Sequence, residues 1–125
     1  MNPTGIIDLP CKHPVAETAD RLEALLKYKG MKIFARIDQA AEAMAVGLTM
    51  RSMVLVIFGD PKTGTPLMNR NPSLAMDLPL KALAWESADG KVWLSYNSPE
   101  FLKQRHNLEV IPFGALAGLL QAATQ

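Results

Sequence analysis

The segment from Gly59 to Met68 carries the residues best suited to binding a ligand. It reads GDPKTGTPLM and combines two glycines, a lysine and two threonines directly after an apolar run. In a P-loop, a lysine directly follows the second glycine, and its ammonium reaches the phosphates. Here Thr65 occupies that position and Pro66 follows it. The sequence therefore argues against a nucleotide-hydrolysing P-loop.

A weaker anion site remains open in the same segment. Residues 62–64 are predicted to form a turn, and Thr65 and Pro66 to begin a short helix as its cap and first residue. Backbone N–H groups at such a helix start could hold a carboxylate or phosphate. The alternative is a structural turn, with glycines at unusual φ and a threonine cap. The candidate ligand-binding residues are Arg51, Lys62, Thr63, Gly64 and Thr65.

Acid–base or metal chemistry would need other side chains. Asp38 and Glu42 are four residues apart and would share one helix face, although capping explains Asp38 better. His106 follows a predicted helix and is a second candidate acid or base. Structural zinc usually takes four ligands, whereas Cys11 and two histidines are the only thiol and imidazole groups here. We therefore expect no metal site, no cofactor and no Cys–His nucleophile pair.

Aromatic and methionine side chains offer apolar surface. Trp85 and Trp93 fall in one predicted hairpin, and we expect them on different faces, so no shared stacking platform is predicted. Packing in a core or an interface is the preferred role of these aromatics. Several of the seven methionines bracket the central region. They could line a pocket for an apolar molecule, although ordinary core filling is the simpler reading.

Composition excludes several classes of protein. The chain has 125 residues, a hydrophobic share of 49% and a net charge of +1, which fits one globular domain over residues 1–125. A nucleic-acid binder usually shows a basic excess, which is absent. A single cysteine gives no sign of an oxidising compartment. No apolar run reaches the ~18 residues of a membrane span, so we expect a cytoplasmic protein without nucleic-acid or membrane partners.

Hydrophobic periodicity predicts the elements that position these residues. Apolar spacing and a closing Gly30 indicate a first long helix, with Pro14 as its first residue. The run Met53–Phe58 indicates a strand that is central or covered on both faces. The alanine-rich helix that Asp38 caps should pack closely on a neighbour. Strands are expected at 4–9, 31–37, 49–58, 80–86 and 92–96, and helices at 14–29, 39–46, 66–68, 73–76, 98–105 and 112–124.

These elements predict an α+β fold: a single domain with a mostly antiparallel five-stranded sheet and helices packed on one face. The turn Asp89–Gly90 between two apolar runs is a strong hairpin signal within that sheet. No internal repeat or linker divides the chain.

Several phrases resemble, in order, the signature of the domain-of-unknown-function 302 family. The resemblance spans about residues 15–108, and its most specific part is Phe58–Met68. It implies a β-α-β4-α arrangement like one repeat of the TATA-box binding protein fold, in small bacterial-type proteins that form homodimers. Relatives often carry a histidine in place of Gln39 and an asparagine in place of Asp60, and no activity is established to carry over. The matching phrases are Ile37–Ala41, Ala45–Leu48, Phe58–Met68, Asp77–Lys81 and Arg105–His106.

The leading functional hypothesis is a non-catalytic, dimeric domain that binds a small molecule or a partner. Its ligand would be small and either anionic or apolar, held near Phe58–Met68. One alternative is an enzyme that uses Asp38, Glu42 or His106 as acid or base, which requires these groups to converge. The other is a purely structural assembly module, which predicts no pocket of about 300 Å³ or larger.

Overall fold

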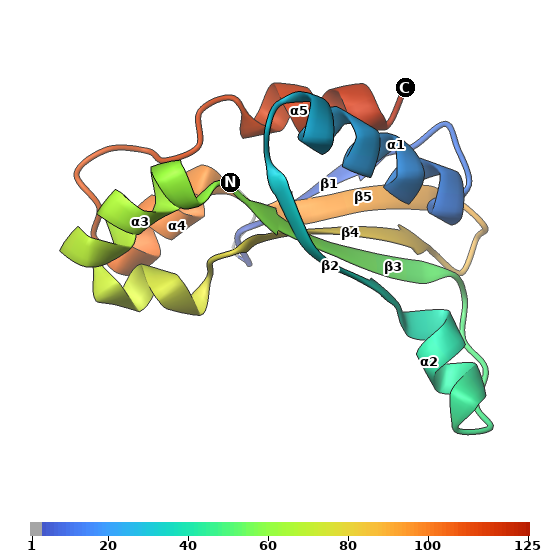
Figure 1. The fold of residues 1–125 in the computed structure, drawn as a ribbon. Helices are drawn as coiled ribbons and strands as arrows, with labels where there is room; N and C mark the ends of the chain where they lie inside the picture. Colours follow the sequence, from blue (N-terminus) through green and yellow to red (C-terminus); the bar gives the residue numbers. More distant parts are fainter. Residues whose placement is uncertain (1–3) are drawn as a thin grey trace.

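Five strands form one antiparallel sheet with the order β1-β5-β4-β3-β2 (Figure 1). The structure is a computed structural model and describes residues 4–125. The sheet confirms the predicted α+β class, and β1 and β2 are its two edges. The strands are β1 (Ile6–Pro10), β2 (Lys32–Asp38), β3 (Met53–Gly59), β4 (Leu80–Glu86) and β5 (Val92–Asn97).

Helices occupy one face and both ends of this sheet. Helices α1 and α5 lie together over one face, α3, α4 and the 3-10 helix η1 gather at one end, and α2 projects from the other end (Figure 1). The shorter helices are insertions in the predicted β-α-β4-α order. The bounds are α1 (Val15–Tyr28), α2 (Gln39–Ala45), α3 (Pro61–Arg70), η1 (Pro72–Met76), α4 (Pro99–His106) and α5 (Leu116–Ala123).

The hydrophobic core lies between the sheet and the layer formed by the two helices α1 and α5. Alternate residues of β3 point into it, so Val54, Val56 and Phe58 are buried while Leu55 and Ile57 are only partly buried. Leu22 and Leu26 of α1 are fully buried against them. The prediction that β3 is covered on both faces is therefore wrong; β3 lies inside the sheet between β4 and the edge strand β2, next to the central strand β4.

Helix α1 follows its predicted pattern closely. Glu17 lies in the first turn, Lys27 in the last, and Gly30 has a left-handed φ of +79° just beyond the end. Pro14 is the N-cap, whereas the sequence reading made it the first helical residue. Its ψ of 162° is extended, which leaves Val15 to begin the helix.

Helix α2 corrects the expectation of close packing. The Asp38 carboxylate caps it by accepting a hydrogen bond from the Ala41 N–H at 3.0 Å, as predicted. No residue of α2 is buried, however. Its alanines present too little surface to hold it on the sheet, and it projects as an arm beyond the end of β2 and the start of β3 (Figure 1).

The segment after β3 also differs from its prediction. Helix α3 begins at Pro61, so residues 62–64 are helical and Pro66 lies inside the helix. The reason is a stronger helix start: the Asp60 carboxylate accepts hydrogen bonds from the Lys62 N–H and the Thr63 hydroxyl, both at 3.1 Å. The predicted anion site at a Pro66 helix start is therefore absent from α3.

The hairpin corrects the reading of the tryptophans. Trp85 of β4 pairs directly with Trp93 of β5. Directly opposite residues of antiparallel strands share a face, so the two indoles lie on the same side of the sheet. The expectation of different faces is wrong, because positions 85 and 93 are eight residues apart and strict alternation already gives them one face.

Candidate functional site

A cavity of about 520 Å³ opens at the end of the sheet where β3 runs into α3. Its walls come from four separate parts of the chain, namely the start of β2, the β3–α3 junction, the approach to β4 and the approach to α5. The size falls within the usual range of small-molecule sites, about 300–1,000 Å³. The lining residues are Met31, Phe34, Gly59, Asp60, Pro61, Thr63, Gly64, Thr65, Met68, Leu78, Pro79, Leu80, Phe113, Gly114, Ala115 and Leu116.

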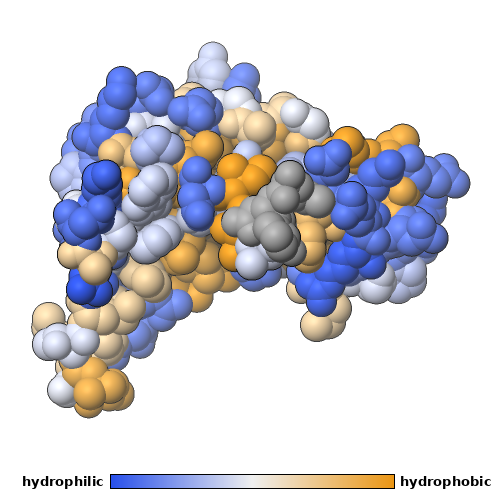
Figure 2. Space-filling view, turned by 180° about the vertical axis from the view of Figure 1, so that it is seen from behind, coloured by the Kyte–Doolittle hydropathy of each residue, from blue (hydrophilic) through white to orange (hydrophobic). Residues whose placement is uncertain are grey.

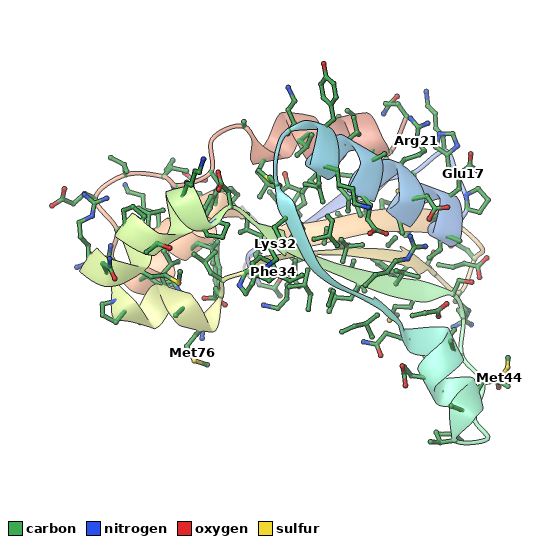
Figure 3. The ribbon with its side chains drawn as sticks, viewed as in Figure 1. Glu17, Arg21, Lys32, Phe34, Met44 and Met76 are labelled. Atoms are coloured by element: carbon green, nitrogen blue, oxygen red, sulfur yellow. The ribbon has the colours of Figure 1, made fainter. Side chains whose placement is uncertain are left out.

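The cavity wall is mostly apolar with one ionisable group. Asp60 is the only charged residue among the lining residues that the structure describes. Each of its carboxylate oxygens already accepts one hydrogen bond from the start of α3, yet each can accept another. The side chain of Lys32 approaches the rim, because its Nζ lies 4.9 Å from the centre of the Phe34 ring (Figure 3).

Two features explain why these residues form a wall. Gly64 is buried in α3, and a Cβ added there would meet Leu78 Cδ1 at 3.6 Å, an ordinary van der Waals distance, so this helix packs closely on the segment before β4. Phe113 has a φ of +56°, in the left-handed region that bulky residues rarely adopt. Such backbone strain is concentrated at functional sites. The loop before α5 replaces the early part of the predicted helix at 112–124, because α5 begins only at Leu116.

The structure brings together only some of the predicted site residues. Thr63, Gly64 and Thr65 line the cavity, whereas Lys62 is exposed and is not among the lining residues. Arg51 lies at the other end of β3. Seven strand residues separate it from α3, which at about 3.3 Å per residue is roughly 20 Å, so Arg51 cannot anchor the same ligand.

Sequence reasoning missed the walls contributed by β2 and by the loop before α5. Phe34 is 44% exposed on an edge strand, and nothing in the alternation of β2 distinguishes it from other outward residues. Phe113 follows α4 along a connection without regular pattern. Only the tertiary contact of these segments with α3 gives them a common role.

The acid–base candidates do not converge. Asp38 caps the projecting α2 and Glu42 lies within it, while His106 ends α4 in the helical group at the opposite end of the sheet (Figure 1). His106 instead contacts two residues that the sequence reading did not single out. Its Nδ1 lies 2.8 Å from the Ser73 hydroxyl, and its Nε2 lies 2.5 Å from the Asp77 carboxylate.

The remaining nucleophile and ligand candidates stay separate. Burial raises the pKa of the Cys11 thiol, only partly countered by a hydrogen bond with Thr18. His13 pairs instead with Glu17 at 3.5 Å and with the Gln125 carbonyl at 2.6 Å. Across residues 4–125, no three His, Cys, Asp or Glu side chains gather as a metal site requires.

The sequence of the chain is similar to part of two curated bacterial proteins. It is 45% identical over 105 residues to "Fluoride-specific ion channel FluC 1" of Brucella suis, a match that covers 84% of this chain and 41% of that protein. The FluC 1 of Brucella abortus is also 45% identical over 105 residues, with 39% of its length covered. The chain thus spans well under half the length of these curated relatives. Within residues 4–125, no helix has the length and apolar character needed to cross a membrane.

A solved structure shares the fold. The crystal structure of an uncharacterized conserved DUF302 protein from Bacillus stearothermophilus matches with a TM-score of 0.79 and 21% identity, over 96% of this chain and 95% of that one. The sequence itself matches the family described as "Domain of unknown function DUF302" over residues 3–124. Together these findings show that the chain belongs to the DUF302 family.

Proposed function

We propose that this chain is a dimeric binding domain whose cavity takes a small, mostly apolar molecule and performs no chemistry on it. The observation that carries the proposal is the cavity of about 520 Å³ with its largely apolar wall and single carboxylate. Its volume exceeds the limit of about 300 Å³ set for a purely structural module. The strained Phe113 backbone at the wall supports a functional use of the same place.

The chemistry of the wall favours an apolar body over an anion. Met31, Met68 and Leu78 supply flexible apolar surface that can adapt to a ligand's shape. An anion would need basic groups or free N–H donors, whereas the charged lining residue is Asp60. A ligand with a hydrogen-bond donor or positive charge at one end would match that carboxylate.

A neutral, apolar dye such as N-phenyl-1-naphthylamine tests this proposal. Titration into the wild-type chain should give saturable fluorescence with one site per chain. Thr65→Trp should weaken binding at least about tenfold, because a bulky side chain on a lining residue of α3 would occupy part of the cavity. Thr65 is exposed and makes no cap contact, so the variant should fold.

Lys62→Ala is the matched control, because Lys62 is an exposed neighbour on α3 outside the cavity wall. It should bind the dye as the wild type does. Equal dye binding by the wild type and both variants would show that the dye binds outside the cavity, which would contradict the proposal. Sodium fluoride forms a second arm of the experiment, suggested by the names of the FluC relatives. Sodium fluoride should leave the melting temperature unchanged. A saturable increase in the melting temperature would instead indicate that the ligand is an anion.

The dimer part of the proposal rests on the face of the sheet opposite α1 and α5. Partly exposed apolar side chains form a continuous row there, since Leu55 pairs with Ile37 on one side and Leu83 on the other. Met53 pairs with Trp85, and Trp85 with Trp93, in a parallel row. Tryptophans and aliphatic residues of this kind are typical of interface cores.

The α2 arm extends this apolar surface. Met44 and Val46 are each 73% exposed, and Leu48 is 64% exposed. Figure 2 shows hydrophobic residues gathered at the tip of the arm. Because each copy carries the same arm and the same open face, a two-fold pairing would cover both surfaces at once.

A further inference from the structure

We propose that Ser73 is a nucleophile for acyl transfer, activated by His106 and oriented through Asp77, with small activated esters as its substrate class. The three side chains form one hydrogen-bonded chain: Ser73 Oγ lies 2.8 Å from His106 Nδ1, and His106 Nε2 lies 2.5 Å from Asp77 Oδ2. A Ser–His–Asp constellation is recognised by geometry and roles, not by sequence order. The proposal is independent of the cavity, whose lining includes none of the three.

The contacts determine the direction of the hydrogen bonds. An ionised carboxylate can only accept, so the Asp77 contact places a proton on His106 Nε2. In the neutral imidazole, Nδ1 is then the acceptor, and the Ser73 hydroxyl donates to it. This is the polarity in which a histidine can act as general base toward a serine.

The three residues differ in their exposure to solvent, and this difference suits their different roles. The side chain of His106 is only 4% exposed and that of Asp77 12% exposed, so their contact is shielded from water. Ser73 lies exposed near the start of η1, where a substrate could reach it. The arrangement thus holds a shielded base and its orienting acid behind an accessible hydroxyl.

Stabilisation of a developing oxyanion would come from a side chain. The N–H of Leu74, directly after Ser73, is already bonded to the Asn71 carbonyl at 2.9 Å. Arg105 is 52% exposed and uses one guanidinium nitrogen on Asp77 at 3.3 Å. Its other N–H groups can donate to an oxygen at the same cluster. With one mobile donor in place of a preorganised pair, we expect slow turnover.

The reaction balances without any further reagent besides water. Ser73 Oγ bonds to the acyl carbon as its proton passes to His106 Nδ1, and the ester C–O bond breaks with its electron pair leaving on the alcohol oxygen. His106 returns the proton to the leaving group. Water then attacks the acyl-serine, gives a proton to His106, and releases the carboxylic acid as Ser73 Oγ regains its proton.

The test uses p-nitrophenyl acetate with the full chain carrying Cys11→Ser, which removes the thiol as a competing nucleophile. The expected result is release of nitrophenolate together with an acetyl group on Ser73, detected by peptide mass spectrometry after acid quench. Ser73→Ala should lower the rate by about 10²-fold, within the range of general-base contributions. Ser52→Ala is the matched control, because Ser52 is also exposed but lies beside β3, and it should leave the rate unchanged.

Asp77→Asn provides a second variant of nearly the same shape. It should also slow acylation and shift its pH profile, because the amide no longer dictates which nitrogen of His106 holds the proton. Circular dichroism melts check that both variants fold. If Ser73→Ala reacts as fast as its parent, or if the acetyl group is found elsewhere, the three residues only tie η1 to α4 and the proposal is wrong.

Discussion

At the scale of single residues, hydrogen bonds hold the charged side chains in defined roles. Arg36 of β2 lies 2.6 Å from Asp20 and 2.7 Å from Glu23, and so joins an edge strand to α1. The hydrogen bond that Arg36 donates to the Glu23 carboxylate is the main reason that the pKa of Arg36 is raised. Asp60 and Asp38 are both helix caps, as their hydrogen bonds show. Thus Asp38, which the sequence offered as an acid–base candidate, serves local structure as a helix cap.

Cys11 gives a pH prediction at this scale. Because burial raises its pKa, the folded chain holds the thiol proton to a higher pH than the unfolded chain does. Alkylation by iodoacetamide should therefore be slower in the native protein than in urea, and the native rate should rise at higher pH. Folding stability should fall as the pH rises above the ordinary thiol pKa, since ionisation then favours the unfolded state.

The control for this measurement is Cys11→Ser, whose stability should lack that part of the alkaline decline. Equal alkylation rates for native and unfolded chains across the pH range would show that the thiol is neither buried nor shifted.

At the scale of elements, close approaches explain where small residues stand. Gly5 precedes β1 with a φ of +75°, and its carbonyl accepts a hydrogen bond from the Ser98 N–H at 2.7 Å. A Cβ at this position would lie 2.2 Å from Cγ of Phe101. The contact holds the start of α4 against the start of the first strand, so it joins two segments that are far apart in the chain.

The matched pair Gly5→Ala and Gly118→Ala tests this reading. Gly5→Ala should destabilise the fold by about 2 kcal/mol or more, through a clash and a strained backbone. Gly118 lies exposed in α5 with nothing within 4 Å of an added Cβ. Gly118→Ala should stabilise by about 0.5–1 kcal/mol through helix propensity. Urea unfolding measures both, and shifts of the same sign would contradict the argument.

At the scale of the whole molecule, apolar surface is distributed unevenly. Helices α1 and α5 cover one face of the sheet. The apolar side chains of the opposite face and of the α2 arm are partly or fully exposed. Figure 3 shows Met44 on the arm and Met76 on η1 at opposite ends of the molecule. Their exposed fractions, 73% and 74%, are nearly equal, which makes them a fair comparison.

We expect Met44→Glu to convert a dimer into a monomer, because it would bury a charge in the proposed interface. Met76→Glu carries the same charge on a surface outside that interface and should stay dimeric. Sedimentation velocity at several concentrations distinguishes the species. A monomeric wild type, or identical behaviour of the two variants, would overturn the dimer proposal.

Much of this fold is readable from the sequence alone, because its signals are local. The period of apolar residues and the closing Gly30 determine α1, and Asp89–Gly90 determines the β4–β5 hairpin. The segment Phe58–Met68 likewise marks both the family and part of the cavity wall. Resemblance to the TATA-box binding protein fold remains a prediction.

What only the tertiary structure decided is which distant residues meet. Phe34 and Phe113 reach the same cavity from segments far apart in the chain, and Ser73 and Asp77 meet His106 across a shorter but still long-range separation. Arg51 and Lys62 are closer in sequence, yet a seven-residue strand directs Arg51 away from the cavity. Local patterns record the free energy of forming a helix or a turn, whereas a site depends on long-range packing that no short stretch encodes.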